Sequence, residues 1–423
     1  MTSLRSVLQS TPICVIGIGL LVGFTVIFCR QFGLLETVEL AAYDWTVRFA
    51  PSPVDRDPRI VLITITEEDL QSLGQWPISD EHIAHALEIL TGYGARTIGL
   101  DVYRDREVLP GRDALNAVLS QHSEIVTVMK FPDQHGRGVL GPPILQGTDQ
   151  IGFNDILVDP GGIVRRGFLF LENEEGTAIS FSLLLALKYL EHEGVVPIPD
   201  LTHPELMTIG RTTIPRFQSN DGSYVGSDAK GYQFLVRFSG RQDSFSQFSL
   251  TELLTGTVTQ EVVKDKIVVI GSSAESVRDD FYTPYSLSRS KQQHMSGMEL
   301  HAHFSNQFLR IALMHERPIH ALPEGLEVCW VLVWGGLSAL LALGLFSPWR
   351  LILCLSAGVG ALLFIVYWGF LASWWIPFVS PALAWVLAGS VATAWISKQQ
   401  RQERMLLMQL FSQHVSTEVA DTI

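Results

Sequence analysis

Cysteine, which disulfide bonds require, is scarce in this 423-residue chain. Only four cysteines are present, and none of them lies between Arg30 and Val328. All four fall inside or beside apolar runs, and their spacings match no zinc-binding pattern. We therefore expect a large middle region that folds without disulfide bonds or a structural metal ion.

Charged residues are also scarce, and basic residues are the scarcer kind. Charged residues of both signs make up 17% of the chain, with 30 Lys and Arg against 43 Asp and Glu, and the net charge is -13. Because phosphate binding needs a basic surface, this balance argues against nucleic acid as a partner. The hydrophobic content of 47% instead points to the lipid bilayer as a partner.

Common catalytic motifs are missing too. The sequence contains no G-x-S-x-G, H-E-x-x-H or P-loop pattern. Gly161 and Gly162 lack the strand–helix setting of a phosphate loop, so they predict a tight turn. Arg165 and Arg166 beside them are possible anion ligands, although arginines on a strand edge are more often solvated. We assign no catalytic residue, and an extracytoplasmic enzyme stays an alternative without a motif behind it.

Two closely spaced histidines, His301 and His303, raise the question of a metal-binding site. They lie in GMELHAHFSNQFL, whose pattern is helical. Side chains two residues apart on a helix do not share a face, so these two are poorly placed to bind one ion. We expect His301 to pack or form hydrogen bonds inside the domain, and we predict no metal or cofactor for this chain.

Long apolar runs, in contrast, are present at both ends. Four of them approach the ~20 residues needed to cross a bilayer. They cover residues 12–29, 326–346, 351–371 and 375–396. The first resembles a signal peptide but has no small-x-small cleavage site, since Phe28, Cys29 and Arg30 follow its core directly, and we predict an uncleaved signal anchor.

Basic residues near the runs predict the orientation of the spans. Arg5, Arg350 and the group Lys398, Arg401 and Arg404 fall on one side of a four-span layout, which is then the cytoplasm. Residues 1–11 and 397–423 are accordingly predicted to be cytoplasmic, and residues 30–325 to form an extracytoplasmic domain. We expect a multi-pass protein of a bacterial plasma (inner) membrane.

The predicted outer domain has an α/β pattern. Four runs of branched residues have continuous rather than alternating apolar character, which is typical of strands in a parallel sheet covered on both faces. They are Arg59–Ile65, Arg96–Val102, Glu124–Phe131 and Lys266–Gly271. A helix that starts at Ser79 and Asp80 and closes near Gly92 joins the first two strands into a βαβ unit.

The rest of the outer domain is predicted to hold a helix and hairpins. The helix covers Ala178 to His192, and antiparallel strands are expected in 151–170 and 207–238, with Asn220–Gly222 as a turn. The predicted fold class is therefore an α/β domain, with a mostly parallel sheet, flanking helices and hairpins, plus four transmembrane helices.

Polar residues just past the strand ends are candidates for ligand binding, because open parallel sheets bind ligands outside their carboxyl edge. The candidates are Glu67, Asp69, Asp101, Ser272, Ser273, Asp279 and Asp280. Together they would form a polar pocket whose carboxylates face a cation, an amine or hydroxyl groups. The alternative is that Asp69 and the serines cap helices and Asp101 pins a loop.

Five sequence blocks carry a family resemblance. They are LITITEEDLQSLGQWPIS, YGARTIGLDVYR, GFNDILVDPGGIVRRG, KIVVIGSSAESVRDDFYTPYS and SGMELHAHFSNQFL, spread between Tyr43 and Leu309. With three close-set spans behind them, they make the chain resemble transmembrane receptors with a CHASE-type-2 domain, the extracellular sensory module of cyclases and histidine kinases. The resemblance implies a homodimeric receptor that senses an unknown extracytoplasmic signal.

The end of the chain extends this resemblance to the class III adenylate cyclase-linked receptors. LLMQLFSQHVSTEVADTI is similar to the segment that leads into their catalytic domain. Phe411, Val415 and Val419 recur at four-residue steps, which suits a parallel helical contact between two protomers. A kinase dimerisation helix or a tail lying on lipid are the alternatives. With Gly325, where the last helix of the outer domain meets the second span, these three residues are predicted to transmit the signal.

The resemblance implies that a catalytic domain making cyclic AMP would follow this segment. Such a domain uses ATP and divalent metal ions held by two carboxylates, and nothing after Arg401 supplies them. We therefore expect no cyclase activity and no cofactor in the chain as given. A membrane-anchored extracytoplasmic enzyme, a partner-binding scaffold and a histidine-kinase sensor remain alternatives.

Overall fold

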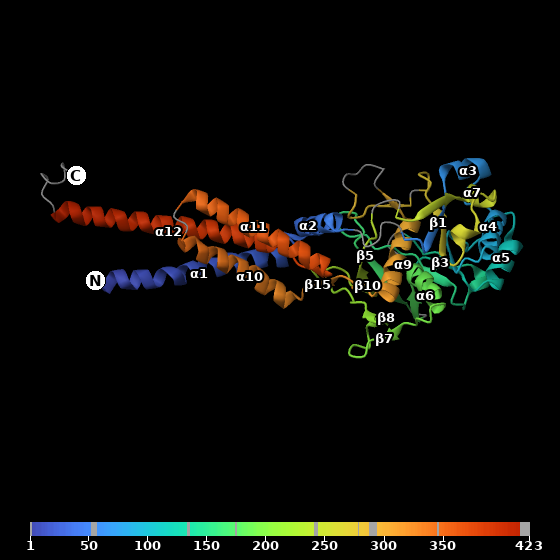
Figure 1. The fold of residues 1–423 in the computed structure, drawn as a ribbon, viewed down its shortest axis with the longest axis horizontal. Helices are drawn as coiled ribbons and strands as arrows, with labels where there is room; N and C mark the ends of the chain where they lie inside the picture. The colour runs from blue at the N-terminus through green and yellow to red at the C-terminus, as the bar shows by residue number, and fades with distance from the viewer. Residues whose placement is uncertain are drawn as a thin grey trace. The chain divides into compact units, whose positions relative to one another are not determined.

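The computed structural model describes residues 2–51, 57–132, 136–173, 176–240, 244–277, 279–286, 294–344 and 347–414. These residues divide into two compact units, whose elements are labelled in Figure 1. The helical unit comprises Met1–Thr46, Ser219–Ser227 and Ala321–Ile423. The α/β unit comprises Val47–Gln218 and Asp228–His320.

A six-stranded sheet forms the centre of the α/β unit, and every pair of neighbouring strands in it is parallel. In spatial order the strands are β11 (Ser246–Ser249), β1 (Ile60–Ile65), β12 (Ile267–Ser272), β2 (Thr97–Asp101), β3 (Ile125–Met129) and β4 (Ile151–Phe153). The four strands predicted from apolar runs are β1, β2, β3 and β12, and they are neighbours in this sheet. The predicted parallel sheet is confirmed.

Helices cover both faces of the sheet, which explains the continuous apolar character of its strands. Along β1, Ile60 and Leu62 belong to one buried cluster, whereas Val61 and Ile63 belong to another. The first cluster includes α6 (Phe181–Glu191) and α9 (Gly297–Met314), which lie side by side in Figure 1. The second includes α4 (Asp80–Gly92), α5 (Arg112–Gln121) and α7 (Leu250–Leu254).

Two three-stranded antiparallel sheets accompany the central one in the described part of the α/β unit. One contains β10 (Tyr232–Leu235), β5 (Arg166–Asn173) and β6 (Gly176–Ile179), and the other contains β7 (Ile198–Pro199), β8 (Met207–Ile209) and β9 (Thr212–Thr213). Short elements complete the unit: α3 (Glu67–Leu73), η1 (Pro143–Leu145), α8 (Gln260–Val263), β13 (Asp280–Phe281) and β14 (Met295–Ser296).

One predicted boundary and one predicted strand pairing in this region differ from the structure. The predicted helix at Ala178 begins later, because Gly176–Ile179 pairs with β5 and Ser180 caps α6 by accepting a hydrogen bond from the Leu183 N–H. The antiparallel strands expected from Ile151 onward do not include β4, which pairs in parallel with β3 at the edge of the central sheet.

Within the described part of the chain, four helices of the helical unit are long and apolar enough to cross a membrane. They are α1 (Thr2–Gln31), α10 (Glu324–Leu341, continued by η3, Ala342–Gly344), α11 (Pro348–Leu371) and α12 (Val379–His414). Small side chains such as Ala339 and Ala392 allow α1, α10 and α12 to pack closely. The α11 helix packs through Leu362 against Trp334 and Trp385.

The fourth span differs in extent from the predicted 375–396. Trp374 and Trp375 are extended (β16), and the Trp375 carbonyl accepts a hydrogen bond from the Leu322 N–H at 3.1 Å. The α12 helix then runs without a break from Val379 to His414. Phe411 therefore lies on the same helix as the span, whereas Val415 and Val419 lie outside the described residues.

A further helix, α2 (Glu36–Phe49), fixes the start of α12. The Glu39 carboxylate accepts hydrogen bonds from the backbone N–H groups of Phe378, Val379 and Ser380 at 3.1, 2.9 and 2.7 Å. The first N–H groups of a helix have no partner within the helix, and the helix dipole favours a negative charge there. Glu39 is itself buried, so it links α2 firmly to the beginning of α12.

A glycine on β4 should be essential for packing α6 against the sheet. A Cβ atom on Gly152 would lie 2.6 Å from the Phe181 Cα, which is backbone and has little freedom to move. We expect Gly152→Ala to lower the free energy of unfolding by about 1–3 kcal/mol through overpacking. Thermal unfolding of the full chain in detergent would measure this change.

Gly92 provides the matched control. It is exposed at the end of α4 and has open space around its Cβ position. Gly92→Ala should leave stability unchanged or raise it by about 0.5 kcal/mol, since alanine restricts the unfolded chain. Equal stability losses in the two variants would contradict the packing argument.

Candidate functional site

Two of the predicted carboxylates come together at the carboxyl edge of the central sheet. Asp101 ends β2, and Asp279 lies between β12 and β13. Because β12 pairs directly with β2, the loop after β12 reaches the end of β2. Burial raises the pKa of Asp101 to about 6, partly opposed by a hydrogen bond from Asn154. Burial, followed by the charge of Asp101, raises the pKa of Asp279 to about 6. We call these two residues the acid pair.

Polar side chains from three other segments surround the acid pair. Asn154, just after β4, donates from Nδ2 to Asp101 Oδ1 at 2.9 Å, and its Oδ1 accepts the Tyr103 hydroxyl at 2.9 Å. His301 on α9 is buried, and its Nδ1 lies 2.8 Å from Ser182 Oγ. Burial lowers the pKa of His301 to about 4, although the Asp279 charge opposes this shift. The imidazole is therefore neutral near pH 7.

This arrangement favours a positively charged or proton-donating group. Two neighbouring carboxylates cannot both ionise without cost, so they retain a proton or bind a cation or amine. Asp101, Asp279, Tyr103 and Asn154 all keep some exposure to solvent. Among the described residues, no group of three or more His, Cys, Asp and Glu has the geometry to hold a metal ion. Two carboxylates beside a tyrosine hydroxyl and an asparagine amide suit a ligand with an amine or hydroxyl group.

The other predicted ligand residues have structural contacts. Asp69 forms a capping box with Thr66 and also accepts the Thr251 N–H at 3.0 Å. Burial opposes ionisation of Asp69, but the hydrogen bonds from Thr251 and Thr66 outweigh it and lower the pKa. Ser272 Oγ accepts the Ala274 N–H at 3.2 Å and so shapes the loop after β12. Asp69 thus agrees with the helix-cap alternative.

The remaining three candidates lie near the same edge. Glu67 accepts the Ser276 N–H at 3.3 Å, and the exposed Ser273 donates its N–H to the Ile65 carbonyl at 3.0 Å. Asp280 is exposed on β13 and lies 3.9 Å from His294. Sequence reasoning missed Tyr103 and Asn154, because only the neighbouring strand ends bring them to the acid pair.

The two arginines after the glycine turn are not solvated, so that expectation was wrong. Gly161 and Gly162 have φ angles of 96° and 82°, which confirms the tight turn. Arg165 and Arg166 are only 3% and 4% exposed, and both bind Asp159 from the start of that turn, Arg166 at 2.5 and 2.9 Å. The anion these arginines bind belongs to the chain itself.

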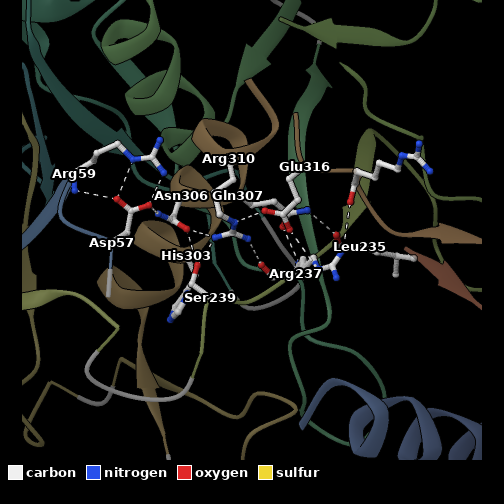
Figure 2. A network of polar contacts seen from close by, with 11 residues as sticks. Asp57, Arg59, Leu235, Arg237, Ser239, His303, Asn306, Gln307, Arg310 and Glu316 are labelled. Atoms are coloured by element: carbon white, nitrogen blue, oxygen red, sulfur yellow. Dashed lines mark hydrogen bonds and ion pairs between the residues drawn. The ribbon is translucent and has the colours of Figure 1, made fainter. Parts of the chain in front are cut away.

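The second histidine belongs to a separate network, drawn in Figure 2. His303 Nδ1 accepts the Ser239 N–H at 3.3 Å, and Ser239 Oγ donates to Asn306 Oδ1 at 2.6 Å. Asn306 in turn donates to Asp57 Oδ2 at 2.6 Å, and Asp57 pairs with Arg59. His301 and His303 therefore have different environments, as the helical spacing indicated. This network holds α9 to the chain around Asp57 and Ser239 and does not suggest chemistry.

A groove of about 470 Å³ lies away from the carboxyl edge. Its walls are mostly apolar, with one arginine and two glutamates. It is lined by Phe170, Glu172, Thr177, Pro197, Ile198, Pro199, Pro204, Glu205, Leu206, Met207, Arg216, Gly231 and Tyr232. Sequence patterns did not predict this groove, because its walls come from several short strands and loops.

Comparison with protein families matches a model of the CHASE2 domain to residues 20–340. The match covers most of the chain, which therefore belongs to the CHASE2 family. CHASE2 is an extracellular sensor domain of signalling receptors. Searches of curated proteins and of solved structures return no match. The chain is thus a CHASE2 sensor joined to four helices with the length and composition of membrane spans.

The acid pair should leave a signature in the pH dependence of stability. Since the pKa of Asp101 is about 6 in the folded state against an ordinary 3.8, its contribution to stability is full below pH 3.8 and is lost as the pH rises through 6. Asp101→Asn removes this charge and preserves the oxygen that accepts from Asn154. We expect the variant to be more stable than the wild type at about pH 7.5, on the order of 2 kcal/mol, and to lose that advantage near about pH 4.

The difference between variant and wild type is the quantity to measure, by thermal unfolding of the full chain in detergent at several pH values. His301 stays neutral when folded, so its own contribution falls as the pH drops below 6.5 and opposes that of the acid pair. Glu68→Gln, at an exposed position on α3, is the control. A stability difference that does not vary with pH would contradict the raised pKa.

Proposed function

We propose that this chain is the sensory and transmembrane part of a homodimeric receptor in a bacterial plasma membrane. In this proposal the CHASE2 domain perceives an extracytoplasmic stimulus, and the spans transmit a rearrangement to a C-terminal connector. The connector regulates a catalytic output domain, for which we favour a class III adenylate cyclase that makes cyclic AMP.

The continuity of α12 is the observation that carries this proposal. At ~1.5 Å per residue its 36 residues extend for about 54 Å, well beyond the ~30 Å of a bilayer's hydrocarbon core. One rigid helix thus connects the segment held by Glu39 to the polar stretch after Ile396. A shift or rotation at its start is passed to its other end without a flexible joint.

The exposed part of α12 supports a dimer. Its last described turns carry large apolar side chains that remain half or more exposed, namely Met405, Leu406, Leu407 and Met408. Such side chains in a polar stretch need a partner surface, and a parallel copy of the same helix provides one. The similarity of this segment to cyclase connectors supports a cyclase rather than a kinase output. ATP and divalent metal ions would then be used by the output domain and not by this chain.

We propose that the stimulus is a ligand that binds at the acid pair. A ligand with an amine or hydroxyl group would replace the proton or water near Asp101 and Asp279. Such a ligand changes the receptor only if it binds one of two arrangements more tightly, and a few kcal/mol of difference is sufficient.

A reporter fusion tests the proposal. The chain is joined at Ile423 to the catalytic domain of an adenylate cyclase, and cyclic AMP is measured in membranes. We expect Asp279→Asn to change the basal output several-fold, since it alters the charge at the acid pair. Glu261→Gln, at an exposed position on α8, is the matched control and should have no effect.

Removal of residues 59–308 gives the second arm of the experiment. Asp279 is removed together with the outer domain, so this fusion is compared with the intact one and should settle at a single output level that differs from the basal output of the intact fusion. If neither the substitution nor the deletion changes cyclic AMP formation, the chain is not a sensor of this kind.

A further inference from the structure

One segment of the outer region of the sequence is part of the helical unit. Residues Ser219–Ser227 follow Gln218 and precede Asp228, which both belong to the α/β unit, yet they group with the membrane helices. The segment is closed on itself, since the Ser227 N–H donates to the Ser219 carbonyl at 3.0 Å. The Gly226 N–H donates to Asn220 Oδ1 at 2.9 Å. We call Ser219–Ser227 the coupling loop.

The tip of the coupling loop packs on Trp375. The Tyr224 ring meets the Trp375 ring edge to face, with centroids 5.7 Å apart, and both residues are at most 4% exposed. Gly222 lies directly against the same indole, where a Cβ atom would overlap ring carbons. The Gly222 carbonyl accepts a hydrogen bond from Arg30, which is also paired with Glu327 on α10. The loop therefore contacts Arg30 at the end of α1 and Trp375 before α12, and it is linked to α10 only through Arg30.

Trp375 connects the loop to the start of α12. It stands four residues before Val379, and its ring lies 4.4 Å from that of Tyr43 on α2. Tyr43 is one turn along α2 from Glu39, so both face the same way. The α2 helix thus holds Trp375 with one residue and the first N–H groups of α12 with the other. A displaced indole would move the beginning of the fourth span.

The other end of the coupling loop is held by Arg166 of the α/β unit. Arg166 Nη1 donates to the Asp228 carbonyl at 3.0 Å, and the guanidinium lies 4.4 Å above the ring of Phe217. These two residues are the stems of the loop. Asp159 fixes the orientation of Arg166 through hydrogen bonds of 2.5 and 2.9 Å. One buried ion pair therefore positions both stems.

This ion pair is also connected to the acid pair. The Val164 N–H, two residues before Arg166, donates to the Tyr282 carbonyl at 2.8 Å. Tyr282 follows Asp279 by three residues on the same short extended segment. A change at Asp279 thus reaches Arg166 through backbone contacts, without crossing a flexible linker.

We propose that the coupling loop transmits changes in the sensor to the fourth span, with Trp375 as the residue that receives them. The inference rests on the proposed function, because it assigns the route by which the sensor acts. A loop fixed at both stems and closed at its neck moves as one body, and its tip is buried against Trp375. Motion of the stems is therefore passed to α12 instead of being absorbed in the loop.

Hydrogen–deuterium exchange of the full chain in lipid nanodiscs tests this route without a ligand or an output domain. The readout is the exchange rate of the Phe378, Val379 and Ser380 amides, which Glu39 protects. Asp159→Asn loosens Arg166 at the stems, and the contacts of Asp159 with Ile163, Arg165 and Arg166 lie within the α/β unit. We expect it to speed exchange of these amides about tenfold. Asp57→Asn is the matched control, since Asp57 is another buried carboxylate paired with an arginine in the α/β unit, and it should change them less than about twofold.

Two glycines test the tip of the loop in the same way. Gly222 and Gly226 have nearly equal φ angles of 59° and 62°, a region that asparagine tolerates. Only Gly222 has Trp375 at its Cβ position, whereas Gly226 has open space. Gly222→Asn should speed exchange at the start of α12, and Gly226→Asn should not. In a Trp375→Ala background, Asp159→Asn should no longer affect these amides.

Slow amide exchange in β1 and β12 confirms that each variant is folded. If Asp159→Asn does not fold, the comparison of Gly222→Asn with Gly226→Asn still tests the route. Equal effects of Asp159→Asn and Asp57→Asn, or of the two glycine variants, would overturn the coupling route. The reporter fusion separates the two proposals. Altered exchange with a constant cyclic AMP output would refute the receptor function alone, and an output that responds to Asp279→Asn with unaltered exchange in the loop variants would refute the route alone.

Discussion

The position of β12 between β1 and β2 determines the arrangement of the sensor domain. A β-α-β unit would place β1 and β2 next to each other, but β12 arrives from far along the sequence and pairs with both. The loop after β12 is thereby brought to the end of β2, which sets Asp279 beside Asp101. Gly271 on β12 also makes room for Met298, so α9 packs directly on this strand and places His301 beneath the acid pair.

The buried carboxylates of the domain differ in the groups that compensate their charge. Burying an ionised group is expensive unless a counter-charge or several hydrogen bonds compensate for it. Asp159 has two arginines, Asp57 has Arg59 and Asn306, and Asp69 has donors from two helix starts. Asp101 and Asp279 instead lie beside each other: burial raises the pKa of both, and the charge of Asp101 adds to the shift at Asp279. Groups that are left with a raised pKa in a partly open position are where a ligand gains most by binding.

The sequence predicted the elements of this fold better than their placement. Uninterrupted apolar runs marked β1, β2, β3 and β12, because both faces of these strands are buried, and start and stop residues marked α4 to the residue. The short strand β4 was assigned to a hairpin, because the sequence of a three-residue strand does not indicate whether the adjacent strand is parallel or antiparallel. Arg165 and Arg166 were expected at a surface, because their partner Asp159 is recognisable only once the turn at Gly161 and Gly162 has brought it back. Of the candidate site, two carboxylates could be predicted from strand ends, but Tyr103, Asn154 and His301 depend on tertiary contacts.

The proposed route from the sensor to α12 could not be predicted from the sequence, because it depends on packing between residues that are far apart in the chain. The sequence predicted a turn at Asn220–Gly222, but it did not indicate that the tip of this turn packs against Trp375. Trp375 itself was assigned to the fourth span, where an indole near the end of a helix is ordinarily an interfacial anchor. In the structure it precedes that helix and is enclosed by Tyr43, Tyr224 and Gly222. A tryptophan so enclosed has little freedom to adjust by itself, so in the proposed route a shift of the loop would move the start of α12. Glu39 binds that start from a separate helix, so α2 would follow, and packed interfaces of this kind favour discrete arrangements over gradual deformation.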